Sequence, residues 1–364
     1  MRDNPALANK PIAVGGSPLR RGVVATCNYE ARKYGIHSAM AAATARKRCP
    51  DLIIIRPDME KYRQASKQIH EVFQAYTSLI EPLSLDEAFL DVSNSLQYQG
   101  SATRIAEAIR KEVKQSVNIT ISAGIAPNKF LAKIASDWNK PDGQFVITPD
   151  QVDEFVRQLP VKKLPGVGKV TAGKMNRLGI NTCDDLRQLT VEQLSEHFGS
   201  FGERLHNLSL GIDDRPVQTE RTRKSVSVEN TYATDLPNLA SCLQELPDLR
   251  QQLNKRLEGI SGDYQIHKQF IKIKFHDFIQ TTVEMISDTI NMENFESLCE
   301  EGFSRGGRPV RLLGMGVRVI PRQSTNPENA SENDPEKDPQ KDSAKNPAKE
   351  GSNQLALTLD QGSL

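Results

Sequence analysis

The chain is organised around the stretch Ser84-Leu85-Asp86-Glu87-Ala88-Phe89-Leu90-Asp91-Val92, in which two neighbouring acids precede an apolar run. A carboxylate is costly to bury unless a cation or hydrogen bonds compensate its charge. Because successive side chains of a strand point to opposite faces, Asp86 and Glu87 can share a metal ion only at a turn or at the start of a strand. Pro82 and Ser84 favour such a start. The pair therefore predicts either a metal site or a solvated turn, and the surrounding sequence has to decide between them.

Length and composition describe a globular protein with room for two or three domains, at roughly 150 residues per domain. The 364 residues are 37% hydrophobic and 26% charged, which is typical of soluble proteins. No run approaches the ~20 apolar residues of a membrane span, and the first residues lack the apolar segment of an export signal. These features predict a cytoplasmic protein without a membrane partner.

Cysteine and charge patterns add two expectations. The five cysteines lie far apart and form neither Cys-x-x-Cys pairs nor clusters with histidine, which predicts free thiols. The net charge is only +1, but residues 324–353 hold seven acids and four lysines, so the rest of the chain is mildly basic. A basic body permits a polyanionic partner without requiring one.

Apolar spacing predicts short strands and amphipathic helices in the first 140 residues. The expected strands cover 11–16, 22–26, 52–55 and 119–125, and the expected helices cover 28–35, 41–48, 58–76, 101–117 and 128–138. Strands that are paired with amphipathic helices in this way predict a sheet covered by helices.

Three side chains in this region are candidates for binding phosphate. Tyr29 and Arg32 share one face of a short helix, near an N-terminus whose free N–H groups favour phosphate. Lys140 stands beside a proline turn that could present its ammonium group. The alternatives are a tyrosine packed against a surface arginine and a solvated turn lysine.

The segment Leu164-Pro165-Gly166-Val167-Gly168-Lys169, followed by Leu178-Gly179-Ile180, has the pattern of a helix-hairpin-helix. In this motif Gly166 and Gly168 let backbone N–H groups approach nucleic-acid phosphates without reading bases. Lys169 adds positive charge. The alternative is an ordinary loop between two helices.

A polar stretch at 220–225 resembles a tether, and a β-α-β-β-α-β pattern follows it. The expected strands cover 226–232, 265–275, 281–287 and 310–320, and the expected helices cover 239–257 and 292–302. Lys272 and Lys274 alternate with apolar residues, which sends both lysines to one face of the sheet. That face suits a phosphate backbone, although an ordinary solvated face fits the pattern equally well.

The end of the chain combines a polar stretch with a short apolar one. Residues 324–353 contain no aromatic, Ile, Leu or Val residue and carry four prolines, which predicts disorder. Apolar residues return in Gln354-Leu355-Ala356-Leu357-Thr358-Leu359. This return is typical of a short linear motif that binds a partner protein.

In this order, the motifs resemble those of Y-family translesion DNA polymerases of the bacterial DNA polymerase IV (DinB) type. The resemblance runs from about Asp3 to Ile320. The matching segments are Tyr29-Glu30-Ala31-Arg32, Ser84-Leu85-Asp86-Glu87-Ala88, Ser122-Ala123-Gly124-Ile125-Ala126, Ala135-Ser136-Asp137-Trp138-Asn139-Lys140-Pro141-Asp142-Gly143, the helix-hairpin-helix and Arg223-Lys224-Ser225-Val226.

The resemblance implies an α+β right-hand polymerase with fingers, palm and a helix-hairpin-helix thumb, plus a β-α-β-β-α-β little finger and a disordered C-terminal tail. The implied boundaries are fingers with a residual palm start at 1–57, palm at 58–149, thumb at 150–218, linker at 219–225, little finger at 226–322, disordered tail at 323–353 and a clamp-binding motif at 354–359.

The resemblance also implies the chemistry. Asp86 and Glu87 would be the catalytic acids and the ligands of two Mg²⁺ ions, while Tyr29, Arg32 and Lys140 would hold an incoming deoxynucleoside triphosphate. The primer-template DNA would be bound by residues of the thumb hairpin and the little finger, namely Gly166, Gly168, Lys169, Lys272 and Lys274. The chain would act as a monomer and dock on the sliding clamp through Gln354, Leu355, Leu357 and Leu359.

One departure from the family pattern leaves two functions open. Family members begin with a strand that carries Asp-x-Asp and two aromatics, just before the segment matching Arg2-Asp3-Asn4-Pro5, and this sequence does not contain it. Asp3 is no substitute, because it matches the helix that follows that strand. Either the true start lies upstream of Met1 or the chain is impaired in catalysis. The two hypotheses are therefore an error-prone DNA polymerase and a DNA- and clamp-binding protein with little or no polymerase activity.

Overall fold

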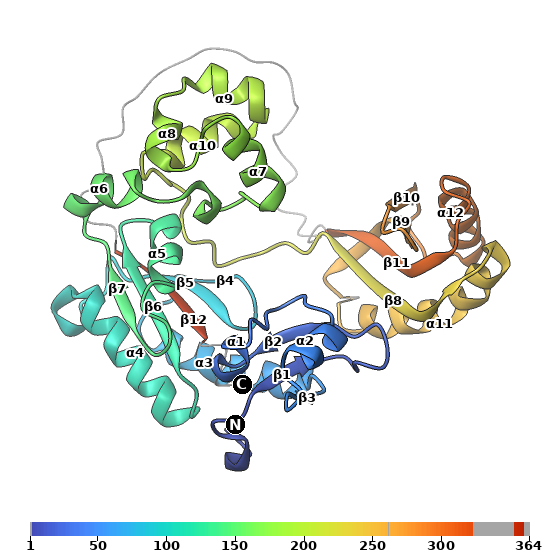
Figure 1. Cartoon of the computed structure of the whole chain (residues 1–364), viewed down its shortest axis with the longest axis horizontal. Helices are drawn as coiled ribbons and strands as arrows, with labels where there is room; N and C mark the ends of the chain where they lie inside the picture. The colour runs from blue at the N-terminus through green and yellow to red at the C-terminus, as the bar shows by residue number, and fades with distance from the viewer. Residues whose placement is uncertain (1, 261, 323–352, 360–364) are drawn as a thin grey trace, which may run out of the picture. The chain divides into compact units, whose positions relative to one another are not determined.

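The computed structural model of the chain describes residues 2–260, 262–322 and 353–359 (Figure 1). The chain forms two compact units. Of the described residues, the first unit comprises 2–16, 23–220 and 353–359, and the second comprises 17–22, 221–260 and 262–322. Within the described parts of the chain, no helix is both long enough and apolar enough to cross a membrane.

A small sheet opens the first unit. Its strand order is β2-β1-β3, with β1 (Ile12–Gly15) antiparallel to β2 (Val24–Cys27) and parallel to β3 (Ile53–Ile55). Two short helices, α1 (Tyr29–Arg32) and α2 (Ala42–Arg48), follow β2. The apolar residues of these elements form a core of their own.

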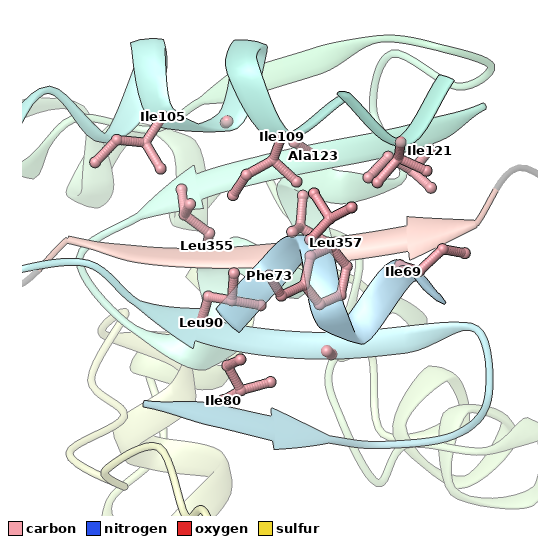
Figure 2. Close-up of a cluster of buried hydrophobic side chains, with 14 of the residues drawn as sticks. Ile69, Phe73, Ile80, Leu90, Ile105, Ile109, Ile121, Ala123, Leu355 and Leu357 are labelled. Atoms are coloured by element: carbon pink, nitrogen blue, oxygen red, sulfur yellow. The ribbon is translucent and has the colours of Figure 1, made fainter. Parts of the chain in front are cut away.

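A five-stranded sheet forms the centre of the first unit, with the order β4-β5-β12-β6-β7. The strands are β4 (Ile80–Pro82), β5 (Glu87–Asp91), β12 (Gln354–Leu359), β6 (Ile121–Ala126) and β7 (Gln144–Val146). Helices α3 (Met59–Gln74) and α4 (Ala102–Ser116) cover one face, and the core lies between them and the sheet. Figure 2 shows Phe73, Ile109 and Leu357 meeting in this core.

The position of β12 was not predicted from the sequence. The sequence predicted a short partner-binding motif at Gln354–Leu359 and no strand of a sheet there. The segment lies between β5 and β6, antiparallel to both, and all six of its residues are buried. The expected disordered tail at 323–353 falls outside the described residues except for Asn353.

Helix α5 (Lys129–Ser136) packs on the other face of the same sheet and leads into a helical subdomain. The helices of this subdomain are α6 (Val152–Arg157), α7 (Lys169–Arg177), α8 (Cys183–Arg187), α9 (Val191–Phe198) and α10 (Phe201–Ser209). Thr182 and Thr190 begin α8 and α9 with capping boxes, which satisfy N–H groups that have no partner inside the helix. Leu186, Leu194 and Leu205 are fully buried between the helices.

The second unit has the expected β-α-β-β-α-β order. Its elements are β8 (Ser225–Leu236), α11 (Leu239–Leu257), β9 (Tyr264–Phe275), β10 (Gln280–Ile286), α12 (Met292–Ser304) and β11 (Val310–Pro321). The four strands form an antiparallel sheet of order β10-β9-β11-β8. Ile271 and Ile273 are buried in the core formed with the two helices, while Lys272 and Lys274 are only half-buried. The alternation predicted for this strand is therefore confirmed.

All five cysteines are free, as the sequence predicted, and all five are buried.

Candidate functional site

The acid pair lies at the start of β5, in the tight connection from β4. The backbone N–H of Leu83 donates to the carbonyl oxygen of Glu87 over 2.9 Å, which closes the connection. The hydroxyl group of Ser84 donates to Oδ1 of Asp86 over 2.5 Å. The carbonyl oxygen of Asp86 accepts a hydrogen bond from the N–H of Leu359 over 2.8 Å. The corner that presents the acids is therefore held by the preceding turn and by β12.

Glu87 forms an ion pair with Lys133 of α5, in which Nζ and Oε1 are 2.6 Å apart. Both side chains are only partly exposed, at 27% for Lys133 and 29% for Glu87, so water screens this pair less than it would a surface pair. The lysine fixes where the carboxylate of Glu87 points. It also occupies an oxygen that a metal ion would compete for.

A second lysine, one turn earlier on α5, neutralises another acid of this sheet. The Nζ of Lys129 lies 2.5 Å from Oε2 of Glu81 and 2.9 Å from the carbonyl oxygen of Pro216. It also lies 5.4 Å from the centre of the Phe89 ring. The side chain of Lys129 is 4% exposed, and a buried charge of this kind requires such a partner.

Neither lysine was identified as functional from the sequence. A signal was present, because Lys129 and Lys133 stand four residues apart in the otherwise apolar helix KFLAKIAS. Such spacing places both on one helical face. Two lysines on a buried face require acids opposite them, but the periodicity does not say which acids these are.

The acid pair fits a divalent cation in chemistry but supplies only part of a coordination shell. Mg²⁺ prefers carboxylate oxygens together with substrate phosphates and water. The contacts with Ser84 and Lys133 each engage one oxygen of the respective carboxylate. Among the residues that the structure describes, no group of three or more His, Cys, Asp or Glu side chains is placed to hold a metal ion. The remaining ligands of a bound ion would therefore have to include substrate phosphates and water.

A small hollow adjoins the acids. Asp86 and Glu87 line it together with Ser66 and His70 from α3 and Thr358 from β12. Burial lowers the pKa of the His70 imidazole below its ordinary value. Tyr29, Arg32 and Lys140 are not among the described residues that line this hollow.

The three predicted phosphate-binding residues lie on two separate elements of the first unit. Tyr29 and Arg32 are half-buried on α1. Lys140 follows α5, and its Nζ is 2.6 Å from Oδ1 of Asp137. The turn around Lys140 is held by Asp142, whose carboxylate accepts a hydrogen bond from Lys114 over 2.7 Å. The structure thus gives the location of each residue, and their joint binding of a triphosphate stays a prediction.

The helix-hairpin-helix loop presents its backbone to solvent. Gly166 has φ +90°, a conformation that suits glycine. Gly168 is the N-cap of α7, and within the described part of the chain no side chain caps that helix, so its first N–H groups face the loop surface. A Cβ atom on Gly168 would meet none of the described residues within 4 Å. Lys169 is exposed beside it. The loop therefore has the open N–H groups that phosphate binding requires.

The polar face of the second unit's sheet carries acids as well as bases. Lys272 pairs with Glu229 at 2.8 Å, and Glu284 pairs with Lys268 at 2.7 Å. Lys274 forms no ion pair within the described residues. The face is therefore mixed in charge rather than uniformly basic, and DNA binding by Lys272 would have to break or share its pair with Glu229.

Comparison with known proteins decides the family. Family models match along most of the chain, with the impB/mucB/samB family at residues 1–137, the DNA polymerase-iota thumb domain at 162–213 and the impB/mucB/samB family C-terminal domain at 223–331. DNA polymerase IV of Pseudomonas syringae pv. tomato is 61% identical over 319 residues, which cover 88% of this chain and 90% of that protein. The chain belongs to the DNA polymerase IV family. DNA polymerase IV of Pseudomonas putida strain F1 is 60% identical with the same coverage.

Solved structures agree with this assignment to the Y-family polymerases. A Y-family DNA polymerase chimera built from Dbh and Dpo4 matches with a TM-score of 0.79 at 28% identity, covering 86% of this chain and 93% of that chain. An insertion ternary complex of Dbh DNA polymerase matches with a TM-score of 0.61 at 26% identity, covering 88% and 94%. The resemblance and the α+β polymerase fold expected from the motifs are therefore confirmed.

Proposed function

We propose that this chain, a translesion DNA polymerase by its family, extends primer 3′-ends in an error-prone way by metal-dependent nucleotidyl transfer at Asp86 and Glu87. The observation that carries the proposal is the corner at the start of β5. Two adjacent carboxylates line a hollow there, and Ser84, Lys133 and the β12 backbone hold them in place.

The proposed chemistry is attack of the primer 3′-hydroxyl on the α-phosphate of the incoming nucleotide. Bound Mg²⁺ ions would stabilise the attacking and leaving oxygens. Asp86 and Glu87 would supply carboxylate ligands, and Lys133 would orient Glu87 through their 2.6 Å ion pair. We assign Tyr29, Arg32 and Lys140 to the triphosphate, because their hydroxyl and cationic groups can bind its oxygens.

We further propose primer-template DNA, deoxynucleoside triphosphates and the sliding clamp as partners. The exposed N–H groups at Gly168 and the charge of Lys169 support backbone binding by the hairpin. Lys272 and Lys274 would contribute from the second unit. Gln354, Leu355, Leu357 and Leu359 would bind the clamp as an extended peptide. Clamp docking requires these residues to leave the buried position that they occupy in β12.

A second candidate function is a DNA- and clamp-binding protein with impaired catalysis. It is favoured by the observation that, among the described residues, no group of three or more His, Cys, Asp or Glu side chains is placed to hold a metal ion. This function needs the hairpin and the C-terminal segment but not the metal site.

Primer extension by the full 364-residue chain tests the two functions against each other. We expect Mg²⁺-dependent extension that falls at least ~100-fold in Asp86→Asn, about 3 kcal/mol of lost transition-state stabilisation. Fluorescence anisotropy with the same primer-template should show unchanged DNA affinity for this variant. DNA binding without extension by the unsubstituted chain would instead establish the second function.

A further inference from the structure

The centre of the five-stranded sheet is filled by the C-terminal segment, which is far in sequence from both of its neighbours. Leu357 is paired with Ala88 of β5 on one side and with Ala123 of β6 on the other. Thr358 is paired with Glu87 and Ser122 in the same register. Because β12 runs antiparallel to both neighbours, β5 and β6 run parallel to each other. Each of them hydrogen-bonds to β12, which lies between them.

The two sides of β12 require residues of different size. Leu355, Leu357 and Leu359 enter the core formed with α3 and α4. On the other side α5 lies close to the sheet, since a Cβ atom on Gly124 would lie 2.0 Å from the carbonyl oxygen of Ala132. At the centre of the strand that side holds the small residues Ala356 and Thr358, and Gln354 lies on the same side at the start of the strand. From Leu355 to Leu359 this position therefore selects an extended segment in which leucines alternate with smaller residues.

One residue of β12 is poorly suited to this position. Gln354 is 7% exposed, and within the described residues its amide oxygen Oε1 is buried without a hydrogen-bond partner. A buried polar group without a partner is unfavourable. The side chain of Gln354 is thus better explained by a second binding state in which its amide group is paired.

We propose that the position between β5 and β6 is a binding site for an extended peptide strand, that Gln354–Leu359 is its occupant, and that this site and a protein partner compete for the same segment. The partner half of the proposal rests on the proposed clamp docking. Leu355, Leu357 and Leu359 are 0%, 2% and 5% exposed in the sheet, so no partner can contact them until β12 leaves. Departure would also remove the strand that is bonded to Asp86, which couples partner binding to the state of the acid corner.

A cysteine pair in the full chain tests occupancy of the site. Thr358→Cys with Ser122→Cys joins two residues that are paired in register, whose Cα atoms should be about 5 Å apart and within reach of a disulfide. Both substitutions are close in size to the original residues and avoid the four proposed clamp-binding residues. Thr358→Cys with Ala123→Cys is the matched control, because Ala123 points to the opposite face of β6.

We expect mild oxidation to link residues 122 and 358 within one chain, with the control pair at least tenfold slower. Peptide mapping by mass spectrometry separates this link from reactions of the five native cysteines. Equal reaction of both pairs, or no link in either, would overturn the strand-site proposal, because another segment or none would then fill the sheet. If disulfides formed only between two chains, the site would be filled by the segment of another chain, and the proposal that Gln354–Leu359 of the same chain occupies it would be wrong.

The same double-cysteine protein tests competition in a binding assay with a bacterial sliding clamp. The reduced form should bind, and the oxidised form should bind at least tenfold more weakly. Equal binding by both forms would refute competition while leaving the proposed clamp docking intact. Absence of binding by either form would refute clamp docking, and with it the competition, whereas the strand site would still be decided by the cross-link.

Discussion

Leu359 donates its backbone N–H to the carbonyl oxygen of Asp86 across 2.8 Å, so the C-terminal strand is bonded directly to the acid corner. On the same strand Thr358 is paired with Glu87, and its hydroxyl group lies 3.1 Å from that of Ser136 on α5. The corner therefore depends on a segment that the sequence assigned to partner binding alone. Removing that segment is expected to disturb synthesis as well as docking.

Leu357→Ala should destabilise the first unit. Leu357 is 2% exposed in the core between the sheet and α3 and α4, and truncating a buried leucine costs about 2–5 kcal/mol through lost burial and the cavity left behind. Urea unfolding followed by Trp138 fluorescence reports on this unit, because Trp138 is the only tryptophan. Leu96→Ala is the control, since Leu96 is 93% exposed. Equal midpoints for the two variants would mean that β12 does not occupy the core in solution.

Lys133→Gln should lower the Mg²⁺ concentration needed for half-maximal primer extension. Lys133 holds an oxygen of Glu87 at 2.6 Å, and a metal ion has to displace or share that contact. Removal of a competing cation from a partly exposed pair is worth about 1 kcal/mol, or roughly fivefold in apparent metal affinity. The maximal rate should fall at the same time, because Glu87 loses the group that orients it. Lys111→Gln, at an exposed position of α4, should change neither value. A higher Mg²⁺ requirement in Lys133→Gln would contradict this account.

Gly168→Ala should weaken DNA binding while the thumb stays folded. The φ of Gly168 is −81° and a new Cβ atom would meet nothing within 4 Å, so the substitution is tolerated apart from a small loss at the N-cap. The added methyl group would lie where a phosphate approaches the N–H groups of α7. We expect roughly 3- to 10-fold weaker binding by anisotropy, about 1 kcal/mol for one impaired hydrogen bond.

Gly173→Ala provides the control for the hairpin, because Gly173 lies within α7 and its Cβ atom would also be in open space. This variant should keep full DNA affinity. Gly166→Ala should behave differently from both, since its φ is +90° and the new atom would lie 2.9 Å from Cζ of Phe201. It should lower thermal stability. Unchanged DNA affinity in Gly168→Ala would remove the hairpin backbone from the DNA-contacting surface.

Local patterns predicted most elements but not the pairing of β12. The predicted helix at 239–257 coincides with α11 (Leu239–Leu257), because a long amphipathic period is a property of the segment itself. The start of a strand at the acid pair was likewise predicted from two neighbouring residues, Pro82 and Ser84. The alternation in Gln354–Leu359 also fits a strand. The sequence of these six residues does not specify, however, that the strand pairs with β5 and β6.

The ion pair between Lys133 and Glu87 escaped prediction for the same reason. Helical spacing places Lys133 on one face of α5, but its partner is determined by how the helix packs on the sheet. Lys272 was predicted correctly to lie on the polar face of β9. Its ion pair with Glu229 was not predicted. Glu229 lies on β8, on the far side of β11, and the alternation of residues within β9 does not reveal the order of strands in the sheet.

Asp142→Asn should reduce the acid sensitivity of the turn that carries Lys140. Partial burial raises the pKa of Asp142, but hydrogen bonds from Lys114 and Arg110 outweigh this effect and hold its pKa below the ordinary value. A carboxylate with a depressed folded-state pKa contributes stability above its unfolded pKa, and the contribution is lost as the pH falls through the folded pKa. The original chain should therefore lose more stability than Asp142→Asn between about pH 5 and pH 3.

Asp150→Asn is the control, at an exposed acid that forms no ion pair in the described chain, and it should lose as much stability as the original chain. Urea midpoints from Trp138 fluorescence measure all three proteins, and parallel pH profiles for the original chain and Asp142→Asn would show that Lys114 and Arg110 do not bind this carboxylate in solution.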